Sequence, residues 1–72
     1  MSEPQAGKPL VLKRERERKG LSLRDLGNLV GVDRSTVSYW EHGLKTPRER
    51  SKFKLVQIFG MRIDELLAED KE

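Results

Sequence analysis

The apolar residues of this chain recur at helical spacing, and glycines separate one apolar group from the next. Residues 9–19 (PLVLKRERERK) favour a first helix that is mostly solvated, because its apolar residues are confined to its start and Gly20 stops it. Residues 23–30 predict a second helix of about two turns, which ends at Gly31. Its apolar stripe consists of Leu23, Leu26, Leu29 and Val30.

Polar residues mark where the second and third helices begin. Ser22 is followed three residues later by Asp25, a pattern in which each side chain bonds the backbone amide of the other. Asp33 is placed to cap a third helix over residues 33–42. Because only one residue separates Asp33 from Gly31, the sequence predicts two short helices around a tight glycine turn.

The last third of the chain predicts a longer helix followed by a short one. The motif TPRE offers Thr46 as a cap, Pro47 in the first turn and Glu49 as the acid of a capping box. Residues 62–67 (RIDELL) predict a final short helix, for which Arg62 is a poor cap. The wide apolar arc of the longer helix predicts the central packing element, with Phe53, Leu55, Val56, Ile58 and Phe59. Five predicted helices place the chain in the all-α class.

Composition narrows the kinds of protein that these helices can build. With 72 residues, 35% of them hydrophobic and 38% charged, the chain makes one domain whose small core must draw on specific helix faces. It has no cysteine and one histidine, so thiolate and multi-histidine metal sites are excluded, and no metal or cofactor is expected. No apolar run has the length of a secretory signal or a membrane span, which indicates a cytoplasmic protein.

Charge is distributed unevenly along the chain. Residues 1–61 hold 13 Lys and Arg against 7 Asp and Glu, whereas residues 62–72 hold 2 against 5. This basic excess favours a polyanionic partner only weakly, and the interleaved signs of KRERERK favour a solvated face over a nucleic-acid contact. We expect a folded domain over residues 9–67, a flexible N-terminal arm at 1–8 and a frayed acidic tail at 68–72.

The segment VDRSTVSYWEHG concentrates aromatic and polar side chains, and helical geometry divides them between two faces. At about 100° per residue, Val37, Trp40 and Glu41 share one side of the third helix. The other side carries Ser35, Ser38, Tyr39 and His42. Trp40 therefore belongs to the core, whereas Tyr39 lies in an exposed row of hydrogen-bonding groups.

This exposed row has two interpretations. Serine and histidine are common on solvated surfaces, but donors, acceptors and a flat ring beside Arg34 also suit base edges and phosphates. Gly27 is small where a large side chain would hold the second and third helices apart, and with the turn at Gly31 it makes a helix-turn-helix. This arrangement favours a contact with bases and phosphates, because the third helix is then free to project outward.

Residues 21–47 (LSLRDLGNLVGVDRSTVSYWEHGLKTP) resemble the helix-turn-helix of the phage Cro and CI repressor family, also called the Xre family. The spacing onward through LVQIFGMRIDELL extends the resemblance to residues 9–67. The turn glycine of the family falls on Gly31 and the small residue on Gly27, where alanine is commoner and glycine costs a helix about 1 kcal/mol. Its core positions fall on Leu26, Val30, Val37 and Trp40. The resemblance implies a compact five-helix, lambda-repressor-like domain with the helix-turn-helix at its second and third helices.

The resemblance also implies a transcriptional regulator, expected to be a repressor, that binds double-stranded DNA with residues 33–42 in the major groove. Bases would be contacted by Arg34, Ser35, Ser38 and Tyr39, of which Arg34 suits guanine. Phosphates would be bound by Ser22, Thr36, His42, Lys45, Thr46 and Arg48. Family members pair an arginine of the first helix with a late glutamate of the recognition helix, which implies a structural ion pair of Arg16 with Glu41. Lys52 and Lys54 are expected to be solvated.

Partners other than DNA follow from the same resemblance. Specific binding normally needs two copies on half-sites about 34 Å apart, so a homodimer on DNA is expected. Its contact could use the apolar residues Ile58, Met61, Ile63 and Leu66, which could instead only close the core. Antitoxins of toxin–antitoxin pairs use this domain, so a protein toxin is an alternative partner. A third alternative is an adaptor that binds only proteins and contacts its partner through Tyr39. An enzyme is disfavoured, because the chain has no phosphate-binding glycine loop and no nucleophile with a positioned base.

Overall fold

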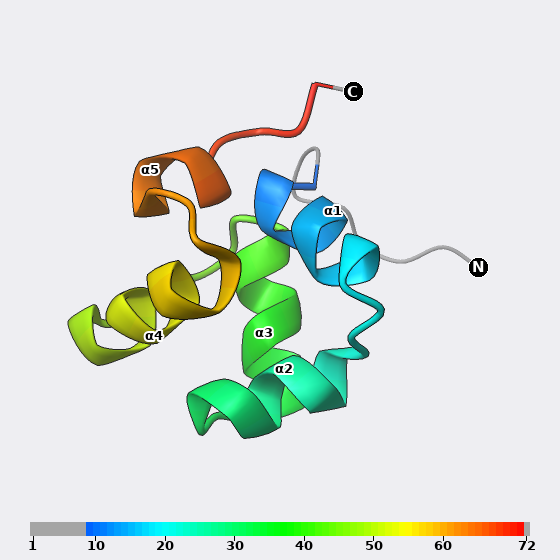
Figure 1. Cartoon of the computed structure of the whole chain (residues 1–72), viewed down its shortest axis with the longest axis vertical. Coiled ribbons are helices and arrows are strands. Elements are labelled where there is room, and N and C mark those ends of the chain that lie inside the picture. Colours follow the sequence, from blue (N-terminus) through cyan, green and yellow to red (C-terminus); the bar gives the residue numbers. More distant parts are fainter. Residues whose placement is uncertain (1–8, 72) are drawn as a thin grey trace.

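Five helices follow one another along residues 9–71, which the computed structural model describes. They are α1 (Val11–Arg18), α2 (Leu23–Val30), α3 (Arg34–Glu41), α4 (Glu49–Phe59) and α5 (Ile63–Leu66). Figure 1 shows α3 in the middle of the molecule, with α1 and α4 on either side of it and α2 across one end. The predicted all-α class is confirmed. None of the helices among the described residues is long and apolar enough to cross a membrane.

The turn between α2 and α3 is built as the sequence predicts. Ser22 Oγ accepts from the Asp25 amide and the Asp25 carboxylate accepts from the Ser22 amide, each at 2.9 Å. Gly31 ends α2 in the left-handed region at φ 90°, where a side chain would be strained. The Asp33 carboxylate then accepts from the Ser35 amide at 3.0 Å and starts α3. The capping signals thus place α2 and α3 in the helix-turn-helix arrangement.

The turn between α2 and α3 leaves no room for a side chain at Gly27. A Cβ atom at residue 27 would lie 2.6 Å from the carbonyl oxygen of Val32, closer than real Cβ contacts. The turn is tight enough that the Gly27 carbonyl accepts from the amides of both Gly31 and Val32, at 2.7 and 2.8 Å. The missing side chain therefore allows the turn to fold back onto α2, which outweighs the lower helix propensity of glycine.

The core draws at least one fully buried side chain from each helix. Its buried members are Leu12, Leu26, Val30, Val37, Trp40, Leu55 and Leu66. Each of these contributes roughly 1.5–3 kcal/mol relative to an exposed side chain, so a core of this size leaves a narrow margin of stability. The core positions implied by the resemblance, on α2 and α3, are all among them.

Two predictions about α4 are wrong. Thr46 does not cap the helix: Pro47 is buried, Arg48 keeps an extended backbone (φ −74°, ψ 167°), and helical geometry begins only at Glu49. Nor is α4 the central packing element, since Leu55 is its only buried residue and the Phe53 side chain is 65% exposed. Residues two apart lie about 200° apart around a helix, so Phe53 and Leu55 cannot both face the core.

The acidic tail is docked and not frayed over its described part, residues 68–71. The Val11 amide donates to the Ala68 carbonyl at 2.9 Å, and the Asp70 amide donates to the Pro9 carbonyl at 3.0 Å. An Arg14–Asp70 ion pair, with 2.8 Å between Nη1 and Oδ1, adds a charged contact to α1. The negative tail thus meets the basic first helix. The arm predicted at residues 1–8, and Glu72, lie outside the described residues.

Candidate nucleic-acid interface

The two faces of α3 differ in burial as the helical spacing predicts. Val37, Trp40 and Glu41 are buried, with no more than 3% of each residue exposed. On the opposite side, Tyr39 is 40% exposed, and Arg34 and Ser35 are also exposed. Thr36, Ser38 and His42 are half-buried. The base-contact candidates therefore lie on a surface that no helix among the described residues covers completely.

A buried ion pair fixes the inner face of α3 against α1. Arg16 Nε donates to Glu41 Oε2 at 2.6 Å, and Arg16 Nη2 donates to Glu41 Oε1 at 3.2 Å. Arg16 Nη1 also donates to the Leu21 carbonyl at 2.8 Å, which ties the loop after α1 to the same guanidinium. No side-chain N or O atom that is buried among the described residues lacks a partner. The two-point geometry leaves α3 little freedom to rotate about its axis.

Ser35, one of the predicted base contacts, takes part in the capping of α3. Asp33 accepts from both the amide and the hydroxyl of Ser35, and these hydrogen bonds, the side-chain one above all, hold the pKa of Asp33 below its usual value. The Ser35 hydroxyl proton is thus already used. Ser35 can present to a base only the acceptor side of its oxygen.

The end of α3 is held by the loop that follows it. Lys45 Nζ lies 4.9 Å from the centroid of the Tyr39 ring, within cation–π range. The Tyr39 carbonyl accepts from the Leu44 amide at 2.9 Å, so the loop folds back over this residue. His42 Nδ1 lies 2.9 Å from the Ser38 carbonyl and donates to it, which leaves Nε2 of His42 for an outside partner.

The structure brings four of the six phosphate candidates to one groove of about 230 Å³. These are Thr36, Lys45, Thr46 and Arg48. Ser22 lies elsewhere, and its capping box with Asp25 puts a carboxylate at the start of α2 and satisfies the Asp25 amide. His42 does not line the groove either. Among the predicted solvated lysines, Lys54 has a structural contact instead: its Nζ donates to the Val30 carbonyl at 3.4 Å, at the end of α2.

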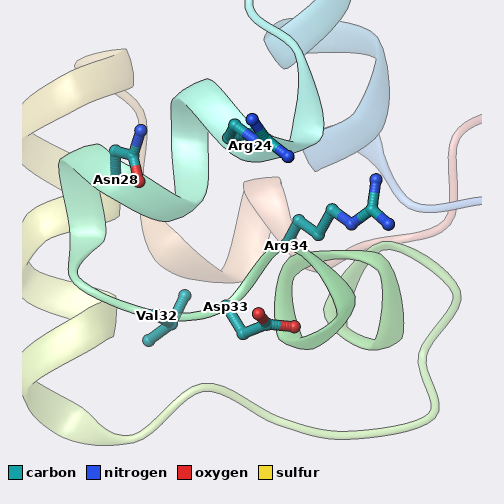
Figure 2. Close-up of a pocket in the computed structure, with 5 residues that line it drawn as sticks. All are labelled: Arg24, Asn28, Val32, Asp33 and Arg34. Carbon is teal, nitrogen blue, oxygen red and sulfur yellow. The ribbon is translucent and has the colours of Figure 1, made fainter.

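Sequence reasoning missed a second groove, between α2 and the start of α3 (Figure 2). Its volume is about 200 Å³ and it is lined by Arg24, Asn28, Val32, Asp33 and Arg34. Arg24 and Asn28 are four residues apart, so they lie on one face of α2, opposite the apolar stripe of that helix. The polar face of α2 was the signal that could have identified this groove.

A helix-turn-helix family model matches residues 12–66. The chain belongs to the Cro/CI-type helix-turn-helix family. An HTH-type transcriptional regulator of Archaeoglobus fulgidus is 33% identical over 57 residues, which cover 79% of this chain and 81% of the relative. An HTH-type transcriptional regulatory protein of Methanosphaerula palustris is 38% identical over 55 residues, 76% of this chain but only 18% of that longer relative.

The family assignment extends to a solved structure. The N-terminal DNA-binding domain of SinR from Bacillus subtilis matches with a TM-score of 0.66 and 32% identity, over 85% of this chain and 90% of the other. The predicted resemblance to the Cro/CI family is therefore confirmed, both by sequence and by the arrangement of the helices.

Proposed function

We propose that the protein is a transcriptional repressor that binds a specific double-stranded DNA sequence with the exposed face of α3. The observation that carries this proposal is the division of α3 into a locked inner face and an exposed outer face. A helix that is to enter the major groove must present side chains to base edges while its own orientation is fixed. The names of the relatives as transcriptional regulators, and of the SinR domain as DNA-binding, support the same conclusion.

The roles of the individual side chains follow from position and chemistry. Arg34 is the first residue of α3 and is exposed, so its guanidinium is suited to bond guanine at two points. Tyr39, held by Lys45, and Ser38 would contact neighbouring bases, with Ser35 as an acceptor. Phosphates would be bound in the groove that contains Thr36, Lys45, Thr46 and Arg48. His42 Nε2 and Ser22 would contribute at the edges.

We also propose that two copies bind together. The molecule measures 33 × 24 × 23 Å, so two copies fit side by side on half-sites about 34 Å apart. Leu66 cannot form the contact between copies, because its side chain is fully buried in the core. Ile58, Met61 and Ile63 are partly exposed where α4 meets α5, and they remain the candidates for this contact.

Selection of duplexes from a random DNA pool by the purified protein, at two salt concentrations, tests this function. The expected result is a two-fold symmetric motif, bound with two copies per duplex and less tightly at higher salt. Arg34→Ala should weaken the preference for one position in each half of that motif. Enrichment of no motif at either salt concentration would contradict sequence-specific binding, and a motif without symmetry would contradict the paired arrangement.

A further inference from the structure

The groove between α2 and the start of α3 is lined by two arginines whose side chains are not tied down by the fold. Arg24 and Arg34 are both exposed, and no hydrogen bond or ion pair ties either of them to a residue between 9 and 71. Figure 2 shows their guanidinium groups reaching toward the same end of the groove, with Asn28 toward the other end. Two like charges that line one groove and form no ion pair there favour an anion between or beside them.

The carboxylates nearest to this groove are already engaged. Asp33 lines the groove, but one of its oxygens accepts from the amide and the hydroxyl of Ser35. Asp25 is engaged in the capping box of α2: its carboxylate accepts from the Ser22 amide, and its own amide donates to Ser22 Oγ. Each acid attracts the arginine beside it in the sequence, but neither forms an ion pair with Arg24 or Arg34 in the described residues. Both guanidinium groups therefore keep their donors for an outside partner.

The place of Arg24 in the fold distinguishes its ligand from that of Arg34. Arg34 lies on α3, which is proposed to enter the major groove, whereas Arg24 lies in the first turn of α2, the helix that crosses the backbone in this arrangement. A residue at that position meets phosphate oxygens before it can reach a base edge. Asn28, one turn further along α2, adds an amide donor on the same side.

We propose that Arg24, with Asn28 beside it, binds a backbone phosphate next to the base pair that Arg34 contacts. This inference rests on the proposed function and adds a site to it. Arg24 is then a positioning residue: it neutralises one phosphate and sets the register of α3, but it carries no sequence information of its own. Arg34 supplies that information from the other side of the same groove.

The test compares dissociation constants on the selected duplex and on a scrambled duplex, each over a range of KCl concentrations. Arg24→Ala should weaken binding to both duplexes by the same factor, about tenfold, and lower the slope of log Kd against log [KCl] by about 0.9. Arg24→Lys should keep the slope but lose part of the affinity, because lysine lacks the two-point geometry. Asn28→Ala should weaken both complexes less and leave the slope unchanged, since it removes no charge.

Arg62→Ala is the matched control, because Arg62 is also exposed but lies just before α5, where its guanidinium pairs with Asp64 at 2.9 Å. An Arg24→Ala protein that behaves like this control, while Arg34→Ala loses discrimination, overturns the phosphate site and leaves the proposed function intact. A loss of discrimination in Arg24→Ala itself would assign Arg24 to a base and overturn the inference equally. Absence of DNA binding by the unaltered protein would defeat the proposed function, and this inference with it.

Discussion

Arginines on α1 and arginines at the α2–α3 groove have opposite surroundings. On α1, Arg14 pairs with Asp70, Arg16 with Glu41, and Arg18 with Glu15. At the groove, Arg24 and Arg34 form no ion pair within residues 9–71, and the neighbouring Asp25 and Asp33 attract them only weakly from the capping positions. The segment with the highest density of basic residues is therefore the one whose arginines are paired within the fold. A basic residue indicates a nucleic-acid contact here only where the fold leaves it without an acid.

The largest effect should come from breaking the buried pair on the α1 side. Glu41→Ala leaves the Arg16 guanidinium buried without its carboxylate, so we expect a loss of about 3–5 kcal/mol in the free energy of unfolding. Urea denaturation followed by circular dichroism measures it. Arg18→Ala is the control, since the exposed Arg18 side chain pairs with Glu15 within one helix and should change stability by about 0.5 kcal/mol or less. Equal effects of the two substitutions would show that the buried pair does not hold α3.

On the groove side, Arg34→Ala should leave stability unchanged and reduce discrimination. The Arg34 side chain forms no hydrogen bond or ion pair within the described residues, so its removal costs only the base contact, about 1–3 kcal/mol of preference for the selected sequence. Competition between selected and point-substituted duplexes measures this preference. A fall in the melting temperature comparable to that of Glu41→Ala would mean that Arg34 is structural after all, and the comparison between the two sides would fail.

A smaller effect should come from the glycine that lets α2 and α3 approach. Gly27→Ala gains about 1 kcal/mol of helix propensity, but its Cβ would meet the Val32 carbonyl oxygen, a backbone atom that cannot move away cheaply. Such crowding costs roughly 1–3 kcal/mol, so we expect a net loss of about 1 kcal/mol in chemical denaturation. Asn28→Ala, on the exposed face of the same helix, should instead be neutral or slightly stabilising. A more stable Gly27→Ala protein would show that the turn is not tight.

The smallest effect concerns the acids that cap α2 and α3. Hydrogen bonds from Ser22 and from Ser35 hold the pKa values of Asp25 and Asp33 below their ordinary 3.8. Folding therefore favours both charged carboxylates, and their contribution is complete above pH 3.8 and is lost as the pH falls through the lower folded pKa values. Melting temperatures between pH 2 and pH 6 should show a smaller acid-induced loss for Asp33→Asn, which keeps the cap without the titration. An unchanged pH profile in Asp33→Asn would contradict the assignment of this step to Asp33.

Local signals in the sequence predicted most of the fold and the orientation of α3. Capping residues, glycine stops and the spacing of Val37 and Trp40 are short-range features, so their effect does not depend on contacts with distant segments. The errors came from contacts between distant segments. The docking of the tail against Pro9 and Val11, and the late start of α4 after the buried Pro47, depend on packing that no local pattern records.

The candidate site was predicted only in part for the same reason. The residues on α3 follow from its own periodicity, but the groove of Arg24 and Arg34 exists only once α2 and α3 are packed together. Likewise, the use of the Ser35 hydroxyl by Asp33 and the Lys45–Tyr39 contact are consequences of side-chain geometry. What a sequence pattern shows is which face a residue occupies, whereas its partners come from the fold.

The most direct test is the addition of the selected duplex to ¹⁵N-labelled protein, followed by amide chemical shifts. We expect the largest changes at Arg34, Ser35 and Tyr39 on α3, with further changes at Arg24 and Lys45, and amides of α1 that stay close to their free positions. Largest changes on α1, with the amides of α3 unmoved, would contradict the claim that the exposed face of α3 meets DNA.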